Sequence, residues 1–390
     1  MITGRTILCF ASGYDAPPTS KHHIMHLLAR RNTVLWVNYH ASRRPRVRPC
    51  DMLRMAGRLC RVFRGLVRAR RNLYVLTPLV LPLPGLWWAR RLNCELLSSQ
   101  IRSAMASVGD GPAQIWSFCP DVSYLLGRFN AERTLYYCVD DFAAFSGYDR
   151  RQVLADEQEL CRRADLVVAS SRALYEAKLP LNDRTIFVPH GVDFSHFAGA
   201  TSGRCEVPRD MSAIGRPRIG FFGLIRDWVD LELVAAVARR RPLWHFVFLG
   251  DSSVDLSAAG GLANVHFLGP KPYRRLPCYC RQFDAAMIPF KVNDLTRSAN
   301  PIKLREYLAA GLGVVSTPLP EVEAYRGLVE IADGPEGFAA AIERLLHAGD
   351  KARRQRVEAM RREDWPVKLE QICECLMNGR RQASAAAAER

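Results

Sequence analysis

The sequence lacks a hydrophobic run long enough to cross a membrane. The best candidate, Leu76 to Ala89, has 14 residues and is interrupted by three prolines, whereas a spanning helix needs about 20 apolar residues. The first residues, Met1 to Arg5, lead straight into a strand-like run without the apolar region of a signal peptide. We therefore expect a chain that stays in the cytoplasm.

Metal-binding and dinucleotide-binding signatures are also missing. Among the twelve cysteines, two close pairs have one intervening residue and neither a second pair nor histidines at zinc spacing, Cys278/Cys280 and Cys373/Cys375. The others are scattered, several within apolar runs, as is typical of reduced core cysteines. No G-x-G-x-x-G pattern opens the first half of the chain, which argues against a nicotinamide enzyme. No D-x-D motif offers a metal clamp for a diphosphate, so we expect neither a metal nor a cofactor.

Acidic residues are fewer than basic ones, 39 against 55, and the net charge is +16. Eleven arginines and one acid lie between Arg43 and Arg71. Five of the arginines recur three or four residues apart, which predicts an amphipathic cationic helix: Arg54, Arg58, Arg61, Arg64 and Arg68. An apolar segment ending in Trp87-Trp88 follows, and arginine beside tryptophan suits an anionic membrane surface.

This basic region, residues 43–93, has two other interpretations. One is a solvated basic helix over an ordinary apolar loop. The other is a nucleic-acid surface, but no nucleic-acid-binding fold signature accompanies the charge. We expect a peripheral position on the inner face of the cell membrane and no nucleic-acid partner.

The 390 residues, 48% of them hydrophobic, are enough for two globular domains. Short apolar strands alternate with helical patterns from end to end, which indicates buried parallel strands. A Gly/Ser/Pro-rich segment interrupts the alternation at 198–217. The sequence thus predicts an α/β fold with two doubly wound, Rossmann-like parallel-sheet domains at 1–197 and 218–380, a cleft between them, and a frayed tail at 381–390.

The most informative segment runs from Asn300 to Thr317. Asn300 and Pro301 predict the cap and first position of a helix that ends at Gly311. Lys303 and Glu306 are three residues apart and share one face near the helix N-terminus. A diphosphate there meets the positive end of the helix dipole and Lys303, and a carboxylate one turn deeper can accept hydrogen bonds from ribose hydroxyls.

This segment resembles the donor-binding motif of GT-B glycosyltransferases of family 4, or group 1. Two further segments are similar to that family in the expected order: Val188 to Phe197 resembles its hinge, and Ile219 to Arg226 its first donor-domain strand and glycine loop. Within the family, the sequences of these motifs most resemble those of bacterial polysaccharide transferases of the teichuronic-acid and xanthan type.

The resemblance implies roles for four residues in binding the donor nucleotide. Lys303 would contact the phosphates, Glu306 the ribose and Arg226 the diphosphate, while Gly223 would let the phosphates approach the backbone. Two positions depart from the family pattern: Ser298 stands where retaining members carry a glutamate, and Gly313 where a proline is usual. The first departure leaves the donor sugar and the stereochemical outcome, retaining or inverting, open.

Asp140 and Asp141 end an apolar strand of the first domain, and a carboxylate there can remove the proton of an acceptor hydroxyl. By position in the xanthan-type enzymes, Asp140 is the closer match to the catalytic base, although either aspartate can instead cap the next segment. His22 and His23 lie where an acceptor would enter, and His190 lies where it can reach the diphosphate. Surface, capping or packing roles are the alternatives for these histidines.

The expected function is transfer of a sugar from a nucleotide-diphosphate donor, with UDP favoured over GDP, to a polyprenyl-linked or polysaccharide acceptor in bacterial cell-surface glycan synthesis. One alternative is a catalytically silent GT-B protein that binds nucleotide or glycan in an assembly complex, which the missing acid at Ser298 favours. Another is a nucleotide-sugar 2-epimerase, which leaves the basic region unexplained.

Overall fold

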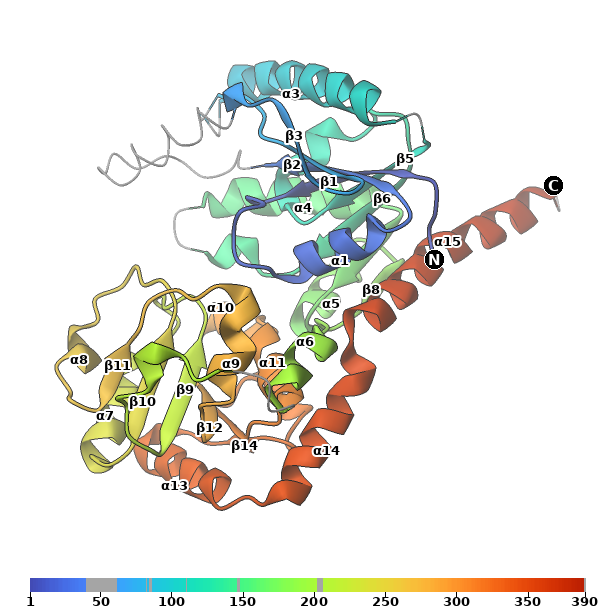
Figure 1. Cartoon of the computed structure of the whole chain (residues 1–390). Helices are drawn as coiled ribbons and strands as arrows, with labels where there is room; N and C mark the ends of the chain where they lie inside the picture. The colour runs from blue at the N-terminus through green and yellow to red at the C-terminus, as the bar shows by residue number, and fades with distance from the viewer. Residues whose placement is uncertain are drawn as a thin grey trace. The chain divides into compact units, whose positions relative to one another are not determined.

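A computed structural model describes residues 1–39, 62–81, 83, 86–109, 111–145, 148–201 and 206–388. The chain forms two compact units. Unit 1 comprises Met1–Pro189 together with Leu369–Arg390, and unit 2 comprises His190–Lys368 (Figure 1).

Unit 1 contains an eight-stranded sheet in the order β3-β4-β2-β1-β5-β6-β7-β8. All neighbouring strands are parallel except β3 and β4, which are antiparallel. The strands are β1 (Thr6–Ala11), β2 (Thr33–Asn38), β3 (Leu66–Arg70), β4 (Leu73–Leu76), β5 (Ala113–Ser117), β6 (Ala131–Cys138), β7 (Leu166–Ala169) and β8 (Thr185–Phe187). The central strands are apolar on both sides because helices cover both faces of the sheet.

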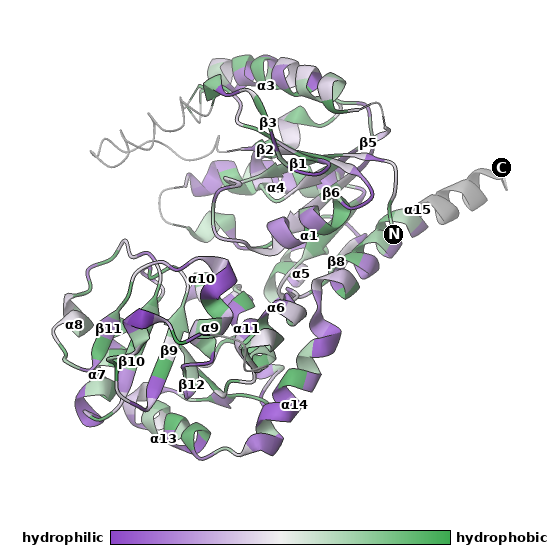
Figure 2. Ribbon diagram, viewed as in Figure 1, coloured by the Kyte–Doolittle hydropathy of each residue, from purple (hydrophilic) through white to green (hydrophobic). Residues whose placement is uncertain are grey.

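Two helices of unit 1 lie on opposite faces of this sheet, α1 (Ser20–Leu28) and α3 (Trp87–Val108) (Figure 1). Leu8 and Phe10 of β1 share a core cluster with Leu97 of α3. Hydrophobic and hydrophilic residues both occur along α3, as expected for a helix with one buried face (Figure 2). The other helices of unit 1 are α4 (Arg150–Arg163), α5 (Arg172–Lys178) and the part of α15 (Trp365–Ala388) that follows Lys368.

Unit 2 contains a six-stranded parallel sheet in the order β11-β10-β9-β12-β13-β14. Its strands are β9 (Arg218–Phe222), β10 (His245–Leu249), β11 (Val265–Phe267), β12 (Ala285–Ile288), β13 (Val314–Ser316) and β14 (Glu330–Ile331). Its helices are α6 (Phe194–Ala198), α7 (Leu231–Arg240), α8 (Ser257–Gly260), α9 (Leu276–Cys280), α10 (Asp294–Arg297), α11 (Ile302–Ala309), α12 (Pro320–Glu323), α13 (Gly334–Leu346), α14 (Asp350–Met360) and the start of α15.

In each sheet there is one point at which the side where successive strands are added reverses. In unit 2 the strands after β9 are added on one side, and from β12 onward they are added on the other. In unit 1 the same reversal falls between β1 and β5. Connections leave such a point in opposite directions, so the crevice at the carboxyl ends of these strands is where α/β folds bind ligands.

The predicted α/β fold with two parallel sheets is confirmed. The apolar runs of the sequence predict ten strands, and each overlaps an observed one: 5–11, 33–38, 114–118, 134–139 and 166–170 in unit 1, and 218–222, 244–249, 265–268, 285–289 and 314–317 in unit 2. Four short strands, β3, β4, β8 and β14, were not predicted. The predicted basic helix is wrong at its end, because Leu66–Arg70 forms the outer strand β3 with four exposed residues. Residues 40–61 of that segment lie outside the described residues.

The compact units differ from the predicted domain boundaries. The segment from His190 belongs to unit 2, because the Val192 backbone N–H donates to the Glu363 carbonyl at 2.9 Å and Phe197 is buried in the unit 2 core. The predicted linker, 198–217, also packs there through Met211 and Ile214. The predicted frayed tail is helical to Ala388.

Candidate functional site

Helix α11 begins one residue later than predicted. Pro301 is the N-cap and Ile302 the first helical residue, so Asn300 is not the cap. No side chain of the described residues caps this helix, which leaves its positive N-terminal end open to an anionic ligand. The predicted end is confirmed: Gly311 has φ +79° and its N–H donates to the Leu308 carbonyl.

Asn300 instead belongs to a buried polar network that fixes the start of α11. Its Oδ1 accepts a hydrogen bond from Arg305 Nη1 at 2.6 Å, and its Nδ2 donates to Glu321 Oε2 at 3.0 Å. The Arg305 guanidinium also lies 5.0 Å from the centroid of the Tyr325 ring. Further along α11, the Tyr307 hydroxyl accepts a hydrogen bond from the Phe222 N–H at 2.8 Å, which links α11 to the end of β9.

Lys303 lies at the switch point of the unit 2 sheet. Its Nζ is 5.3 Å from the ring centroid of Phe221 in β9 and 4.8 Å from that of Phe290 after β12. Both distances are within the range of cation–π attraction. A Cβ on Gly223 would lie 3.0 Å from Lys303 Cε, and Gly223 has φ +133°, which favours glycine. The ammonium is therefore held beside the glycine loop that follows β9.

Glu306 lies one turn deeper and is buried, with 5% of its surface exposed. Burial raises the pKa of its carboxyl to about 8, the nearby Lys303 opposes this rise, and the Asp193 carboxylate adds to it. Asp193 caps α6, since its side chain accepts a hydrogen bond from the His196 N–H. Burial, together with the charges of Glu306 and Asp193, also raises the pKa of Tyr273. Glu306 thus lies in a cluster of acidic groups.

Arg226 is paired with a carboxylate from the neighbouring loop. Its Nη2 lies 3.0 Å from Asp251 Oδ2, and its Nη1 donates to the Asp251 carbonyl at 2.9 Å. Asp251 follows β10, so this pair lies at the same edge of the sheet as Gly223. The Asp251 side chain is 59% exposed, and the pair therefore costs little to open.

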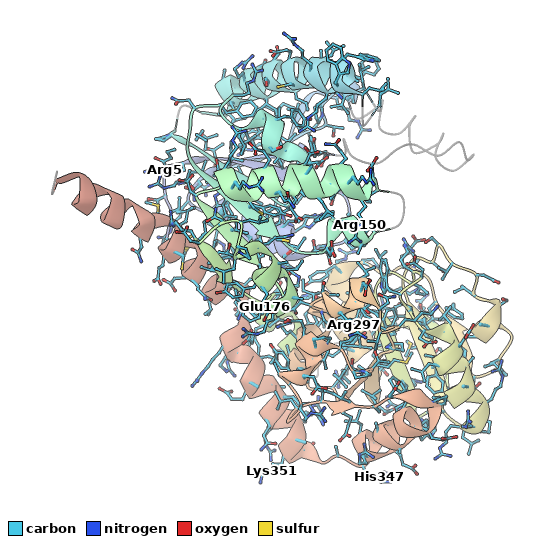
Figure 3. All side chains as sticks on the ribbon, turned by 180° about the vertical axis from the view of Figure 1, so that it is seen from behind. Arg5, Arg150, Glu176, Arg297, His347 and Lys351 are labelled. Atoms are coloured by element: carbon cyan, nitrogen blue, oxygen red, sulfur yellow. The ribbon has the colours of Figure 1, made fainter. Side chains whose placement is uncertain are left out.

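Ser298, which replaces the glutamate of retaining relatives, is the C-cap of α10. It follows Arg297, the exposed last residue of that helix (Figure 3). Gly313 packs closely against α13, because a Cβ at this position would lie 2.9 Å from Leu345 Cδ2.

The two candidate base residues of unit 1 have different surroundings. Asp141 is the N-cap of a short 3₁₀ helix, Phe142–Ala144, and its Oδ1 accepts a hydrogen bond from the Ala143 N–H at 3.1 Å. Asp140 is half-buried at the end of β6, and its charge raises the pKa of Lys21 against the larger effect of burial. The capping role therefore falls on Asp141.

The three candidate histidines differ in their burial and in their contacts. His22 is buried, its Nδ1 accepts from the Thr19 N–H at 3.1 Å, and its Nε2 donates to the Tyr14 carbonyl at 3.0 Å. Burial lowers the pKa of His22 to about 3, so it acts as a neutral cap of α1. His23 is half-buried on the same helix. His190 is buried in unit 2 near the Trp365 ring, and burial lowers its pKa to about 3.

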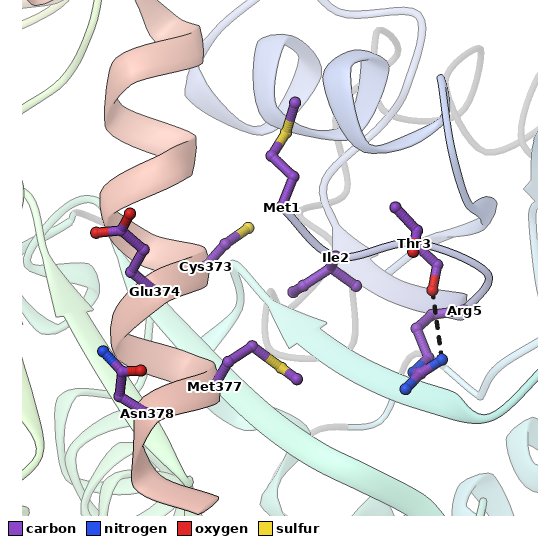
Figure 4. A pocket seen from close by; sticks show the side chains of 8 residues that line it. All are labelled: Met1, Ile2, Thr3, Arg5, Cys373, Glu374, Met377 and Asn378. Atoms are coloured by element: carbon purple, nitrogen blue, oxygen red, sulfur yellow. Dashed lines mark hydrogen bonds between the residues drawn. The ribbon is translucent and has the colours of Figure 1, made fainter. Parts of the chain in front are cut away.

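The structure also has a pocket of about 310 Å³ in unit 1, where the N-terminal segment meets α15 (Figure 4). Its lining residues are Met1, Ile2, Thr3, Arg5, Cys373, Glu374, Met377 and Asn378, none of them a predicted site residue. The cysteines in the described part of the chain are free thiols. Over the same residues there is no cluster of side chains that could hold a metal ion and no helix apolar and long enough to span a membrane.

Comparisons with known proteins agree with this geometry. Residues 216–348 match the family model described as "Glycosyl transferases group 1". A Bacillus subtilis protein whose name is that of a teichuronic acid biosynthesis glycosyltransferase, TuaH, is 28% identical over 282 residues, which cover 66% of this chain and 70% of that protein.

The structure is similar to two solved GT-B structures. A sucrose-phosphate synthase from Thermosynechococcus elongatus has a TM-score of 0.66 at 15% identity and covers 98% of this chain and 100% of its own. Anabaena Alr3699/HepE, solved with UDP and glucose, has a TM-score of 0.65 at 14% identity and covers 95% of this chain and 98% of its own.

The chain therefore has the GT-B fold, and its residues 216–348 match the group 1 glycosyltransferase model. This match and the similarity to TuaH support a glycosyltransferase activity of EC class 2.4.

Within unit 2 the structure brings together Gly223, Lys303 and Glu306, and it places Arg226 on the loop after β9. Asp140, Asp141, His22 and His23 lie in unit 1. Asp193 and Tyr273 also lie near Glu306, and neither was a predicted site residue. Asp193 lies within the segment that resembles the family hinge, so the sequence contained a signal for it. Nothing in the sequence around Tyr273 points to this site.

The raised pKa of Glu306 makes the stability of the fold depend on pH. The folded state holds this proton up to about pH 8, whereas an unfolded chain releases it near its ordinary pKa, about 4.3. The contribution of Glu306 is therefore full at acidic pH and is lost as pH rises toward 8, at up to about 1.4 kcal/mol per pH unit. We expect Glu306→Gln to become more stable relative to wild type as pH rises from 5 to 8, as measured by urea unfolding.

The exposed Glu336 provides the control for this measurement, since its side chain is 86% exposed. Glu336→Gln should leave the difference from wild type constant over the same range. A Glu306→Gln difference that is also constant would contradict the assigned protonation state.

Proposed function

We propose that this chain transfers a sugar from a UDP-sugar donor to a hydroxyl of a lipid-linked or polysaccharide acceptor. The observation that carries the proposal is the placement of Lys303 and Glu306 on α11, beside Gly223 at the switch point of unit 2. The UDP in the HepE structure supports uracil as the base of the donor nucleotide. The name of TuaH supports a cell-surface polysaccharide as the product.

The donor diphosphate is the group for which this site is suited. Its oxygens would meet the uncapped N-terminus of α11 and the Lys303 ammonium, which is already held over two aromatic rings. Arg226 would exchange its exposed partner Asp251 for a phosphate oxygen. These cations would stabilise the charge that develops on the leaving UDP, in the role that a metal ion plays in other transferases, so no metal is required.

Glu306 would bind the ribose of the donor. Two ribose hydroxyls can donate hydrogen bonds to its carboxylate, and this binding favours the ionised form that burial disfavours. Donor binding would therefore release a proton near neutral pH.

Asp140 would act as the general base in unit 1. Its carboxylate takes the proton of the acceptor hydroxyl while that oxygen bonds to the anomeric carbon and the bond from this carbon to the diphosphate oxygen breaks. The products are the glycosylated acceptor, UDP and protonated Asp140. Asp141 is unsuited to this role because its carboxylate caps a 3₁₀ helix.

Replacing each aspartate by asparagine tests this assignment. Asp140→Asn removes the base and should lower the transfer rate by at least about a hundredfold, while UDP binding is unchanged. Asp141→Asn keeps an oxygen for the Ala143 N–H and should retain transfer. The measurement is UDP release from UDP-sugars with membrane extracts as acceptor.

Equal transfer by wild type and Asp140→Asn would remove Asp140 as the base. A known glycosyltransferase assayed with the same extracts is the positive control. If that enzyme transfers sugar while the wild-type chain binds UDP without transfer, the result would favour a catalytically silent scaffold.

We further propose that unit 1 binds an anionic membrane surface. Eight of the fifteen large hydrophobic residues exposed in the described part of the chain fall between residues 63 and 92: Phe63, Val67, Leu79, Leu83, Leu86, Trp87, Trp88 and Leu92. Trp87 is 76% exposed and opens α3. The outer strand β3 adds the exposed Arg68 and Arg70. Tryptophan and arginine together suit the interface of an anionic bilayer, and this supports a lipid-linked acceptor.

Vesicle binding tests this surface. The chain should bind vesicles containing phosphatidylglycerol more strongly than pure phosphatidylcholine vesicles, and added salt should weaken binding. The double variant Trp87→Ser/Trp88→Ser should lower the partition coefficient by at least about tenfold, because it removes two interfacial anchors.

Leu243→Ser is the matched control, since Leu243 is 80% exposed in unit 2. It should bind vesicles as wild type does. If the wild-type protein does not bind anionic vesicles at low salt, the proposed membrane surface is wrong.

A further inference from the structure

Two stretches of unit 2 that are far apart in the sequence pair with each other, residues 190–194 and 363–365. The Val192 N–H donates a hydrogen bond to the Glu363 carbonyl at 2.9 Å, and the Trp365 N–H donates to the Val192 carbonyl at 3.2 Å. The first stretch begins unit 2, and the second lies close to its end. Together they form one paired element of the unit.

The Glu363 side chain of this paired element lies beside two cations. Its Oε2 is 3.7 Å from Arg305 Nε and 2.7 Å from Lys368 Nζ. The Arg305 side chain is 1% exposed and that of Lys368 is 10% exposed, so both ion pairs are largely shielded from water. Because Arg305 belongs to α11, Glu363 connects the paired element with the helix that carries Lys303 and Glu306.

Arg305 is a buried charge in the middle of a helix, and such a charge is unfavourable unless hydrogen bonds and an opposite charge compensate it. Three groups compensate it: Asn300 Oδ1, which accepts a hydrogen bond from Nη1 at 2.6 Å, the Tyr325 ring at 5.0 Å, and the Glu363 carboxylate. The planar guanidinium is thus held in one orientation from three sides. Its contact with Asn300 reaches back to the residues that precede α11.

The segment that Arg305 holds presents the groups suited to a phosphate. Asn300 directly precedes Pro301, the N-cap of α11, and Lys303 is the second residue of the helix. Backbone N–H groups bind an anion well when they and a nearby cation point at the same place. A displacement of the Arg305 guanidinium would therefore move the first N–H groups of α11 and Lys303 together.

We propose that Glu363 is a positioning residue for the donor diphosphate: it holds the Arg305 guanidinium, and Arg305 holds the start of α11 where its N–H groups and Lys303 meet the phosphates. This inference rests on the proposed function, because it requires a nucleotide diphosphate at α11. Glu363 acts through Arg305 and forms no bond to the donor.

The affinities for UDP and for uridine separate this role from general support of the fold. Uridine has the ribose and the base but no phosphate, so its binding does not use the N–H groups of α11 or Lys303. Glu363→Gln removes the charge beside Arg305 at nearly constant size. It should raise the Kd of UDP about fivefold, a usual size for a change in a contact network away from the ligand, and leave the Kd of uridine unchanged. Both values are measured by calorimetry, with uridine titrated as a competitor of UDP.

Two matched controls should bind UDP as wild type does. Lys368→Met removes the other cation beside Glu363 Oε2 and leaves the pair with Arg305 in place. Glu358→Gln removes a carboxylate that is 71% exposed and paired with Arg361. Arg305→Lys retains a cation but not the planar fork, and it should raise the Kd of UDP as Glu363→Gln does.

The outcomes separate this inference from the function on which it rests. An unchanged ratio of the Kd values for uridine and UDP in Glu363→Gln overturns the positioning role, while UDP binding itself stands. A wild-type protein that does not bind UDP overturns the proposed function and this inference together. If Glu363→Gln does not fold, as judged by its thermal unfolding, the same ratio in Arg305→Lys decides the question.

Discussion

The candidate donor site depends on one cation, the Lys303 ammonium, at the switch point of a parallel sheet. Lys303 lies over the rings of Phe221, in β9, and Phe290, which follows β12, and these are the two strands where the order of unit 2 reverses. Its position requires that α11 begin at Ile302, and the buried network of Asn300, Arg305 and Glu321 fixes that start. The close approach of Lys303 to Gly223 follows from this placement. The raised pKa of Glu306 follows from burial, and Lys303 opposes it.

The same constraint applies in unit 1 with different residues. There the reversal falls between β1 and β5, and the charged groups at that edge are Lys21 and Asp140. Both sheets thus present a cation and a carboxyl group at the end of their central strands. In unit 2 the carboxyl is buried and favours its neutral form until a ligand arrives. In unit 1 the Lys21 ammonium donates a hydrogen bond to the Ser12 hydroxyl, and burial keeps the nearby thiols of Cys9 and Cys119 uncharged.

The alternation of apolar strands and helices predicted both sheets, because buried parallel strands are apolar on both faces and leave a clear pattern. It missed β3 and β14, which are edge strands with little burial, and it extended a helix into β3 because arginines at helical spacing also fit an exposed strand. The motif around Lys303 and Glu306 was visible because its residues are close in sequence. Asp193, Tyr273 and Lys21 reach their partners only through tertiary structure, so local patterns could not reveal them.

We expect a donor diphosphate to bind at the N-terminus of α11, with its ribose on Glu306. The most direct measurement is the thermal unfolding of wild type and Glu306→Ala with UDP, GDP, UDP-glucose and UDP-glucuronate. A ligand at a hundredfold excess over its Kd stabilises the fold by about 2.7 kcal/mol. We expect uridine nucleotides to raise the unfolding temperature of wild type, and we expect this rise to be lost in Glu306→Ala. An equal rise in both proteins, or no rise with any nucleotide, would contradict it.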